Sequence, residues 1–185
     1  MDYERIYRKY FRQKIIESDN KNINEKLSER MRIIQAVSEI YTSVYYIDMS
    51  SGQFSEISSF DIVHNHIGNE GDAQERLNYF CRNMIMPDYT DEMLEFVDLS
   101  TLDERLRHNR IVSKQYISSI MSSENKEGHP GWNECCFIEG DRDFAGRLSH
   151  VIFATQNIHG AKCRELEAQK KLQETNDKLT SLFDA

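Results

Sequence analysis

Long apolar runs are missing from this sequence. No stretch approaches the ~18–20 consecutive apolar residues that cross a bilayer as a helix. The first five residues, MDYER, also lack the basic-then-apolar order of a secretory signal. The sequence therefore predicts no membrane segment in this chain, and we expect a cytoplasmic location.

Paired cysteine motifs are missing as well. The cysteines are Cys81, Cys135, Cys136 and Cys163, and no two of them form a C-x-x-C pair. The adjacent side chains of Cys135 and Cys136 would point to opposite faces of a strand, which makes a poor metal chelate. We therefore expect no metal site, no disulfide framework and a reducing compartment.

Basic residues are scarce in one long stretch of the chain. Between Asp48 and Glu104 there are 13 Asp and Glu residues against only Arg76 and Arg82, a local balance of 2 − 13 = −11, whereas the whole chain carries −8. A surface of this charge repels phosphate backbones, so the sequence argues against a nucleic-acid partner.

The N-terminal part is predicted to be helical. Residues 2–17 place aromatic side chains on one face and basic side chains on the other, which is typical of an amphipathic helix. A second helix is expected to end near Tyr41. We assign residues 2–41 to an N-terminal helical cap.

The middle of the chain alternates between strand and helix patterns. Residues 44–48 and 53–57 predict a hairpin around Gly52, and helices are expected at 73–86, 91–97 and 102–109. Strands are then expected at 114–121, 132–138 and 148–156, with Trp132 buried at the start of its strand. The loops between these last strands are too short for crossover connections, so the prediction is an α+β fold with a five-stranded antiparallel sheet.

Four local motifs in this order resemble the PAS domain family. They are the entry hairpin SVYYID (43–48) followed by Gly52, the GHPGW turn (128–132), the DFAG turn (143–146), and ATQNIH (154–159) followed by Lys162 and Glu165. The last motif resembles the family's terminal D-I-T-x-x-K-x-x-E signature, with Asn157 in place of Asp and His159 in place of Thr. The resemblance implies a PAS-like sensor core at 42–157 with short helices on one side of the sheet.

The resemblance also implies a function. The amino-acid sequences of the early and late strands are similar to sensor segments of bacterial diguanylate cyclases and histidine kinases. The sequence contains no GGDEF motif, no phospho-acceptor histidine motif and no nucleotide-binding glycine box. We therefore expect a non-enzymatic regulatory piece of a larger signalling protein, with a diguanylate cyclase as the first candidate output and a histidine kinase as the second. The alternative is a ligand-free dimerisation or spacer module.

Three features raise the question of a cofactor. Cys81-Arg82 resembles the photoactive cysteine of flavin-binding relatives without the surrounding N-C-R-F-L-Q run, which favours a buried structural thiol. His108 lies where haem-binding relatives place a ligand, but its neighbours are polar. His64 and His66 have no suitably spaced metal-binding partners. We expect no cofactor.

Aromatic residues on the predicted strands are candidates for lining a ligand pocket. They are Tyr45, Phe54, Phe137 and Phe153. The alternative is that they simply form the core. A polar group facing inward among them would favour a small-molecule ligand of unknown identity, whereas tight apolar packing would favour the spacer.

The C-terminal segment, 158–185, predicts a long charged helix. Small and apolar residues recur at 3–4 spacing, as in a coiled-coil seam. The seam candidates are Ala161, Ala168, Leu172, Leu179 and Leu182, with Glu165 and Thr175 as weak points. This pattern favours a homodimer through the exit helix over packing of the helix against its own domain.

Overall fold

A computed structural model describes residues 36, 40–59, 61–119 and 131–183. The expected helical cap at 2–41 therefore lies almost entirely outside the described residues, as do most of the GHPGW turn and the last two residues of the chain.

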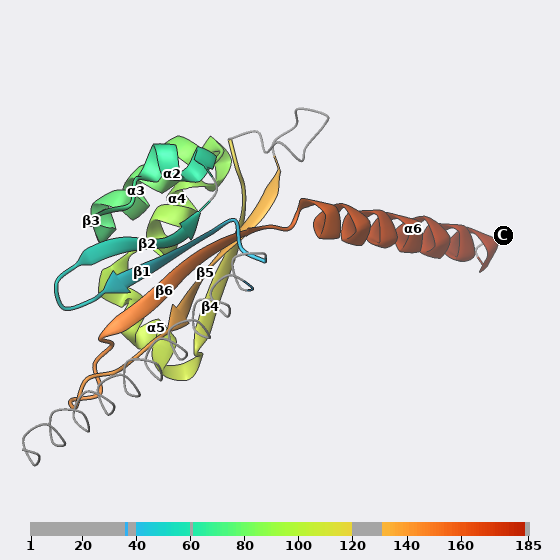
Figure 1. Cartoon of the computed structure of the whole chain (residues 1–185). Coiled ribbons are helices and arrows are strands. Elements are labelled where there is room, and N and C mark those ends of the chain that lie inside the picture. Colours follow the sequence, from blue (N-terminus) through green and yellow to red (C-terminus); the bar gives the residue numbers. More distant parts are fainter. Residues whose placement is uncertain (1–35, 37–39, 60, 120–130, 184–185) are drawn as a thin grey trace, which may run out of the picture. The chain divides into compact units, whose positions relative to one another are not determined.

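The strands form a single antiparallel sheet in the order β3-β2-β1-β6-β5-β4 (Figure 1). Their bounds are β1 (Ser43–Asp48), β2 (Gln53–Ser59), β3 (Glu70–Asp72), β4 (Ile111–Ile117), β5 (Trp132–Glu139) and β6 (His150–Asn157). Because β1 and β6 pair at the centre, the entry hairpin lies beside the last strand, from which the exit helix continues.

Short helices connect β2 to β4, and a long helix follows β6. They are α2 (Asp61–Ile67), α3 (Ala73–Met84), α4 (Pro87–Phe96), the 3-10 helix η1 (Leu99–Thr101), α5 (Leu102–His108) and α6 (His159–Phe183). The carboxylate of Asp72 caps α3 by accepting from the backbone N–H of Glu75 at 2.8 Å. Pro87 starts α4, where its missing N–H costs nothing.

The core lies between one face of the sheet and the helices from α2 to α5. On the sheet side the largest fully buried side chains include Tyr45, Phe137 and Phe153, and on the helix side Leu77 and Leu106. The prediction of an α+β fold with short helices on one side of an antiparallel sheet is thereby confirmed (Figure 1).

The strand number is a correction, because the sheet has six strands and not five. The additional strand, β3, consists of Glu70-Gly71-Asp72 and pairs with β2. It contains no apolar side chain, so hydrophobic alternation cannot reveal it. Gly71 has φ 143°, and a Cβ there would lie 2.8 Å from Nε of Arg76, which explains why a glycine occupies this strand.

Other features also differ from the expectation. Strand β4 spans Ile111–Ile117 and not 114–121. Helix α2 contains His64 and His66, which lie outside the helices that the sequence predicts. Helix α4 begins four residues before the expected Asp91, because Pro87 is favourable in the first turn of a helix; the preceding helix ends earlier, at Met84. Among the described helices, none combines the length and apolar character that a membrane span requires.

Candidate functional site

The four aromatic pocket candidates lie together in the core. The rings of Tyr45 and Phe54 stack with centroids 4.4 Å apart, and that of Phe153 lies 6.5 Å from Tyr45 and 5.0 Å from Phe137. All four side chains are at most 1% exposed. The rings thus fill the space next to one another on the inner face of β1, β2, β5 and β6.

Tyr45 places its hydroxyl, a polar group, within this aromatic cluster. Its hydroxyl is buried, and the side chains of Ser59 and Ser43 lie within hydrogen-bonding reach of it. Burial raises the pKa of Tyr45, and the nearby carboxylate of Glu56 acts in the same direction. The phenol is therefore neutral at physiological pH and can donate one hydrogen bond and accept others.

Further hydroxyl groups lie on the same inner face. Ser43 pairs in register with Ser59 on one side and with Thr155 on the other. The hydroxyls of Ser43 and Thr155 hydrogen-bond each other at 2.7 Å, and Ser59 Oγ is buried beside the Tyr45 hydroxyl. We call Ser43, Tyr45, Ser59 and Thr155 the hydroxyl cluster.

One contact between a histidine and a carboxylate borders the hydroxyl cluster. Nδ1 of His64 lies 2.9 Å from Oε2 of Glu56, so that α2 is joined to β2. The Glu56 side chain is 16% exposed and that of His64 48%. The partly buried carboxylate makes this side of the core unfavourable for anions.

A second cluster of contacts lies where α6 leaves the sheet. Asn157 ends β6, and its Oδ1 accepts from the backbone N–H of His159 at 2.9 Å. The backbone N–H of Ile158 donates to the carbonyl of Trp132 at 3.0 Å. The side chain of Asn157, at the position where the PAS signature has Asp, thus connects the end of β6 to the first residue of the exit helix.

Trp132 joins three elements at this point. Its ring meets that of Tyr89 on α4 edge-on at 5.8 Å, and Nζ of Lys162 lies 5.7 Å from its centroid. Its backbone N–H points to Nδ1 of His159 at 3.4 Å. Trp132 starts β5 as predicted and is partly buried. We call Trp132, Tyr89, His159 and Lys162 the exit junction.

Beyond the exit junction, the seam candidates lie exposed along α6 in the single chain. Leu172 is 64% exposed and Leu179 48% exposed, and both Ala161 and Ala168 are exposed. Leu182 lies within the helix, and its side chain is outside the described part of the chain. Leu172 and Leu179, on one face of α6, therefore have no cover from the part of the chain that the structure describes.

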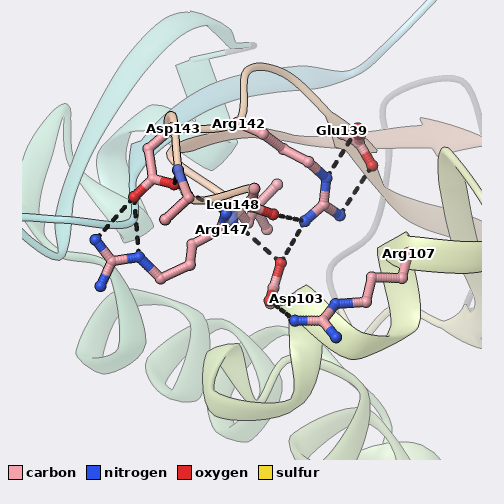
Figure 2. Close-up of polar contacts among 9 residues, drawn as sticks. Asp103, Arg107, Glu139, Arg142, Asp143, Arg147 and Leu148 are labelled. Atoms are coloured by element: carbon pink, nitrogen blue, oxygen red, sulfur yellow. Dashed lines mark hydrogen bonds and ion pairs between the residues drawn. The ribbon is translucent and has the colours of Figure 1, made fainter.

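A network of ion pairs fixes the other end of β6 (Figure 2). Arg142, in the turn between β5 and β6, donates to both carboxylate oxygens of Glu139 and, at 2.6 Å, to Asp103 on α5. Asp103 also accepts from the backbone N–H of Leu148 at 3.1 Å. The Arg142 bond is the main cause of a lowered pKa of Asp103.

The turn between β5 and β6 has an internal framework of its own. Asp143 accepts from the backbone N–H groups of Ala145 and Arg147 at 2.8 and 2.9 Å, and Gly146 has φ 76°. The sequence analysis identified this DFAG turn but not its link to α5, because Asp103 and Arg142 are 39 residues apart and no local pattern connects them.

The residues considered for cofactors lie apart from one another. Cys81 is buried on α3, and burial raises the pKa of its thiol to about 12. His108 is exposed at the end of α5. Among the described residues, no group of three or more His, Cys, Asp and Glu side chains is arranged to hold a metal ion.

Comparison with known proteins gives a likeness in structure only. No family model matches the sequence, and no curated protein matches it. The chain is similar to a sensory box histidine kinase/response regulator from Burkholderia thailandensis E264, with a TM-score of 0.50 and 15% identity over 79% of this chain and 98% of that chain.

Two further solved structures are described as PAS domains. One is from Colwellia psychrerythraea, with a TM-score of 0.42 and 11% identity over 72% of this chain and 98% of that chain. The other is from Bordetella pertussis BvgS, with a TM-score of 0.39 and 17% identity over 80% of this chain and 98% of that chain. The likeness to the Burkholderia protein, at a TM-score of 0.50, shows a PAS-like fold, as the motifs predicted.

Proposed function

We propose that residues 42–157 form a sensory module without catalytic activity of its own, and that α6 relays its state to an output domain as part of a parallel homodimer. The observation that carries the proposal is the exposure of Leu172 and Leu179 on one face of a 25-residue helix. An isolated helix is marginal in water unless its apolar stripe is buried, and a second copy of α6 supplies matching seam positions.

The contacts at the base of α6 support the relay. Trp132 connects α6 to β5 and to α4, and β6 continues directly into the helix. A change in the helical layer that moved Tyr89 would therefore act on the start of α6. Because the energy available from such contacts is small, the relay needs an exit helix with two packing arrangements of similar stability.

The output remains a proposal that rests on resemblance. We propose a diguanylate cyclase first and a histidine kinase second, in a cytoplasmic protein. Both classes occur among the structural neighbours, in the Burkholderia protein and in a diguanylate cyclase sensor from Marinobacter aquaeolei. Because a fold does not fix a function, only the residues of the output domain itself can distinguish a diguanylate cyclase from a histidine kinase.

A ligand-free spacer is the second candidate function. The stacking of Tyr45 on Phe54 and the tilted contact of Phe153 with Phe137 favour it. The inward hydroxyl of Tyr45 places a polar group among these rings and favours a ligand instead. We rank the ligand-responsive sensor first, because a pure spacer gains nothing from placing a polar group among the aromatic side chains of its core.

Disulfide cross-linking tests the parallel seam. Cys163 is first changed to serine, since it is the only cysteine of the four that is not buried. In that background, Leu172→Cys is expected to form an intermolecular disulfide under mild oxidation, because equivalent seam residues meet in a parallel coiled coil. Leu166→Cys is the matched control, being exposed on α6 but outside the seam. Equal cross-linking of the two variants would contradict the seam.

A further inference from the structure

A thiol and an imidazole meet on the first turns of α6, beside the exit junction. Sγ of Cys163 lies 3.6 Å from Nε2 and 4.0 Å from Nδ1 of His159, which stands one helical turn earlier. Both side chains are partly exposed, so an ion from solvent can reach them. The other three cysteines are buried. Cys163 is therefore the thiol of this chain at which a cation can bind without the core opening.

The separation of the sulfur and nitrogen atoms fits a metal chelate. Thiolate sulfur and imidazole nitrogen bind Zn²⁺ at about 2.3 and 2.0–2.1 Å, and a tetrahedral angle between the two bonds puts the donors about 3.5 Å apart. The Sγ–Nε2 distance of 3.6 Å is already close to this value. The sequence predicted no metal site because its cysteines form no C-x-x-C pair, whereas here the second donor is a histidine on the same helix face.

Oxygen donors can complete the coordination of an ion at this pair. Glu167 lies one further turn along the same helix face and is exposed. Its carboxylate, together with water, can occupy the positions that the two side chains leave open. Lys162 is the adjacent cation, and its Nζ lies 2.9 Å from Oε2 of Glu165, which offsets its repulsion of a bound ion. These residues suit an exchangeable ion better than a closed structural site.

The imidazole of His159 connects such an ion to the exit junction. The backbone N–H of Trp132 points to Nδ1 of His159 at 3.4 Å, so in the ion-free protein Nδ1 is the acceptor and Nε2 carries the ring proton. An ion on Nε2 leaves the ring proton to Nδ1, and an ion on Nδ1 uses the lone pair itself. Whichever nitrogen binds the ion, the N–H of Trp132 loses its acceptor.

We propose that His159 and Cys163 bind a divalent cation of the Zn²⁺ class, and that binding detaches the N–H of Trp132 from the start of α6. The Cys163 thiol gives its proton to solvent, and its sulfur and one imidazole nitrogen each donate an electron pair to the ion without any change of oxidation state. The metal site is independent of dimerisation, whereas its effect on the output rests on the proposed function. Loss of one hydrogen bond can shift two arrangements of similar stability by about fivefold.

Cadmium ions are the probe for the thiolate ligand, because a cadmium–thiolate bond absorbs in the ultraviolet and reports the sulfur directly. The reduced 185-residue chain is titrated with Cd²⁺ and the absorption is followed. One saturable equivalent is expected, which Zn²⁺ displaces and Mg²⁺ does not, because thiolate and imidazole suit Zn²⁺ whereas Mg²⁺ takes oxygen ligands. The absence of a saturable band, or its removal by Mg²⁺, would overturn the proposal.

Single substitutions identify the two ligands. Cys163→Ser should abolish the band, and His159→Ala should weaken Cd²⁺ binding by roughly tenfold or more, because one of two side-chain ligands is lost. His108→Ala, at an exposed histidine at the end of α5, should bind like the wild type. His159→Gln replaces the alanine variant if that one loses helix content. Equal affinity of the His159 variant and the wild type would mean that the thiol acts alone, and would overturn the proposal.

Amide spectra test the connection to Trp132. On addition of Zn²⁺, the Trp132 amide resonance is expected to shift in the wild type and to stay in place in Cys163→Ser. Zn²⁺ binding that leaves this resonance unmoved in the wild type would overturn the detachment of Trp132. The cross-linking of Leu172→Cys uses the Cys163→Ser background and so does not depend on this site. Metal binding without cross-linking would remove the relay and keep the metal site, and cross-linking without metal binding would do the opposite.

Discussion

Replacement of Trp132 by alanine tests whether the exit junction connects the sheet to α6. Full truncation of a buried Trp costs about 3–5 kcal/mol, and Trp132 is only partly buried. Its edge contact with Tyr89 at 5.8 Å and the Lys162 cation at 5.7 Å are part of what is lost. Such contacts contribute about 0.5–1.5 and 0.5–1 kcal/mol. We therefore expect Trp132→Ala to lower the free energy of unfolding by about 2 kcal/mol.

Urea unfolding followed by circular dichroism measures this loss, because the variant has no tryptophan left to report by fluorescence. Hydrogen exchange adds the local readout. The backbone N–H of Ile158 donates to the carbonyl of Trp132, so its exchange should become faster in the variant than expected from global unfolding alone.

Trp132→Phe is the matched control for the exit junction. This variant keeps an aromatic edge for Tyr89 and a ring face for Lys162. Its free energy of unfolding should therefore fall by only about 1 kcal/mol, and the hydrogen exchange of the Ile158 amide should stay close to that of the wild type. If Trp132→Ala unfolds like the wild type and Ile158 remains equally protected, Trp132 does not hold α6 and the relay route through it is wrong.

Two further predictions concern the end of β6 shown in Figure 2. Gly146 has φ 76° and open space around the position of a Cβ. Gly146→Ala should therefore lower the free energy of unfolding by about 1–2 kcal/mol through backbone strain alone, whereas Gly146→Asn should lower it less. Thermal unfolding of the two variants measures both losses. The lowered pKa of Asp103 stabilises the folded state above the unfolded value of about 3.9, and this contribution is lost as the pH falls through the lower folded pKa. Asp103→Asn should therefore make the free energy of unfolding less dependent on pH below about pH 4. If urea titrations at several pH values give the same pH dependence for the variant and the wild type, this reasoning is wrong.

The sequence predicted those elements whose patterns are local. Val44 to Asp48 is rich in β-forming residues, and the turn at Gly52 has the positive φ of 69° that a glycine supplies readily. The exit helix was predicted by its seam. In each case the signal lies in the periodicity or turn chemistry of a few consecutive residues.

The parts that escaped prediction depend on contacts between distant residues. Strand β3 exists because Glu70-Gly71-Asp72 can pair with β2, although its own composition does not favour a strand. The Asp103–Arg142 pair and the hydroxyl cluster are each assembled by the fold from separate elements. Ser43 and Thr155 do stand at inward positions of apolar strands, which is the one sequence signal that could have identified them.

Sedimentation equilibrium of the 185-residue chain and of seam variants tests the central claim, association through α6. The wild type is expected to form a reversible dimer. The double variant Leu172→Glu/Leu179→Glu is expected to be monomeric over the same concentrations, because it places like charges on an apolar seam. The control Leu166→Glu, on the same helix but outside the seam, should dimerise like the wild type. A wild type that stays monomeric at high concentration, or a double variant that dimerises as well as the wild type, would contradict the account.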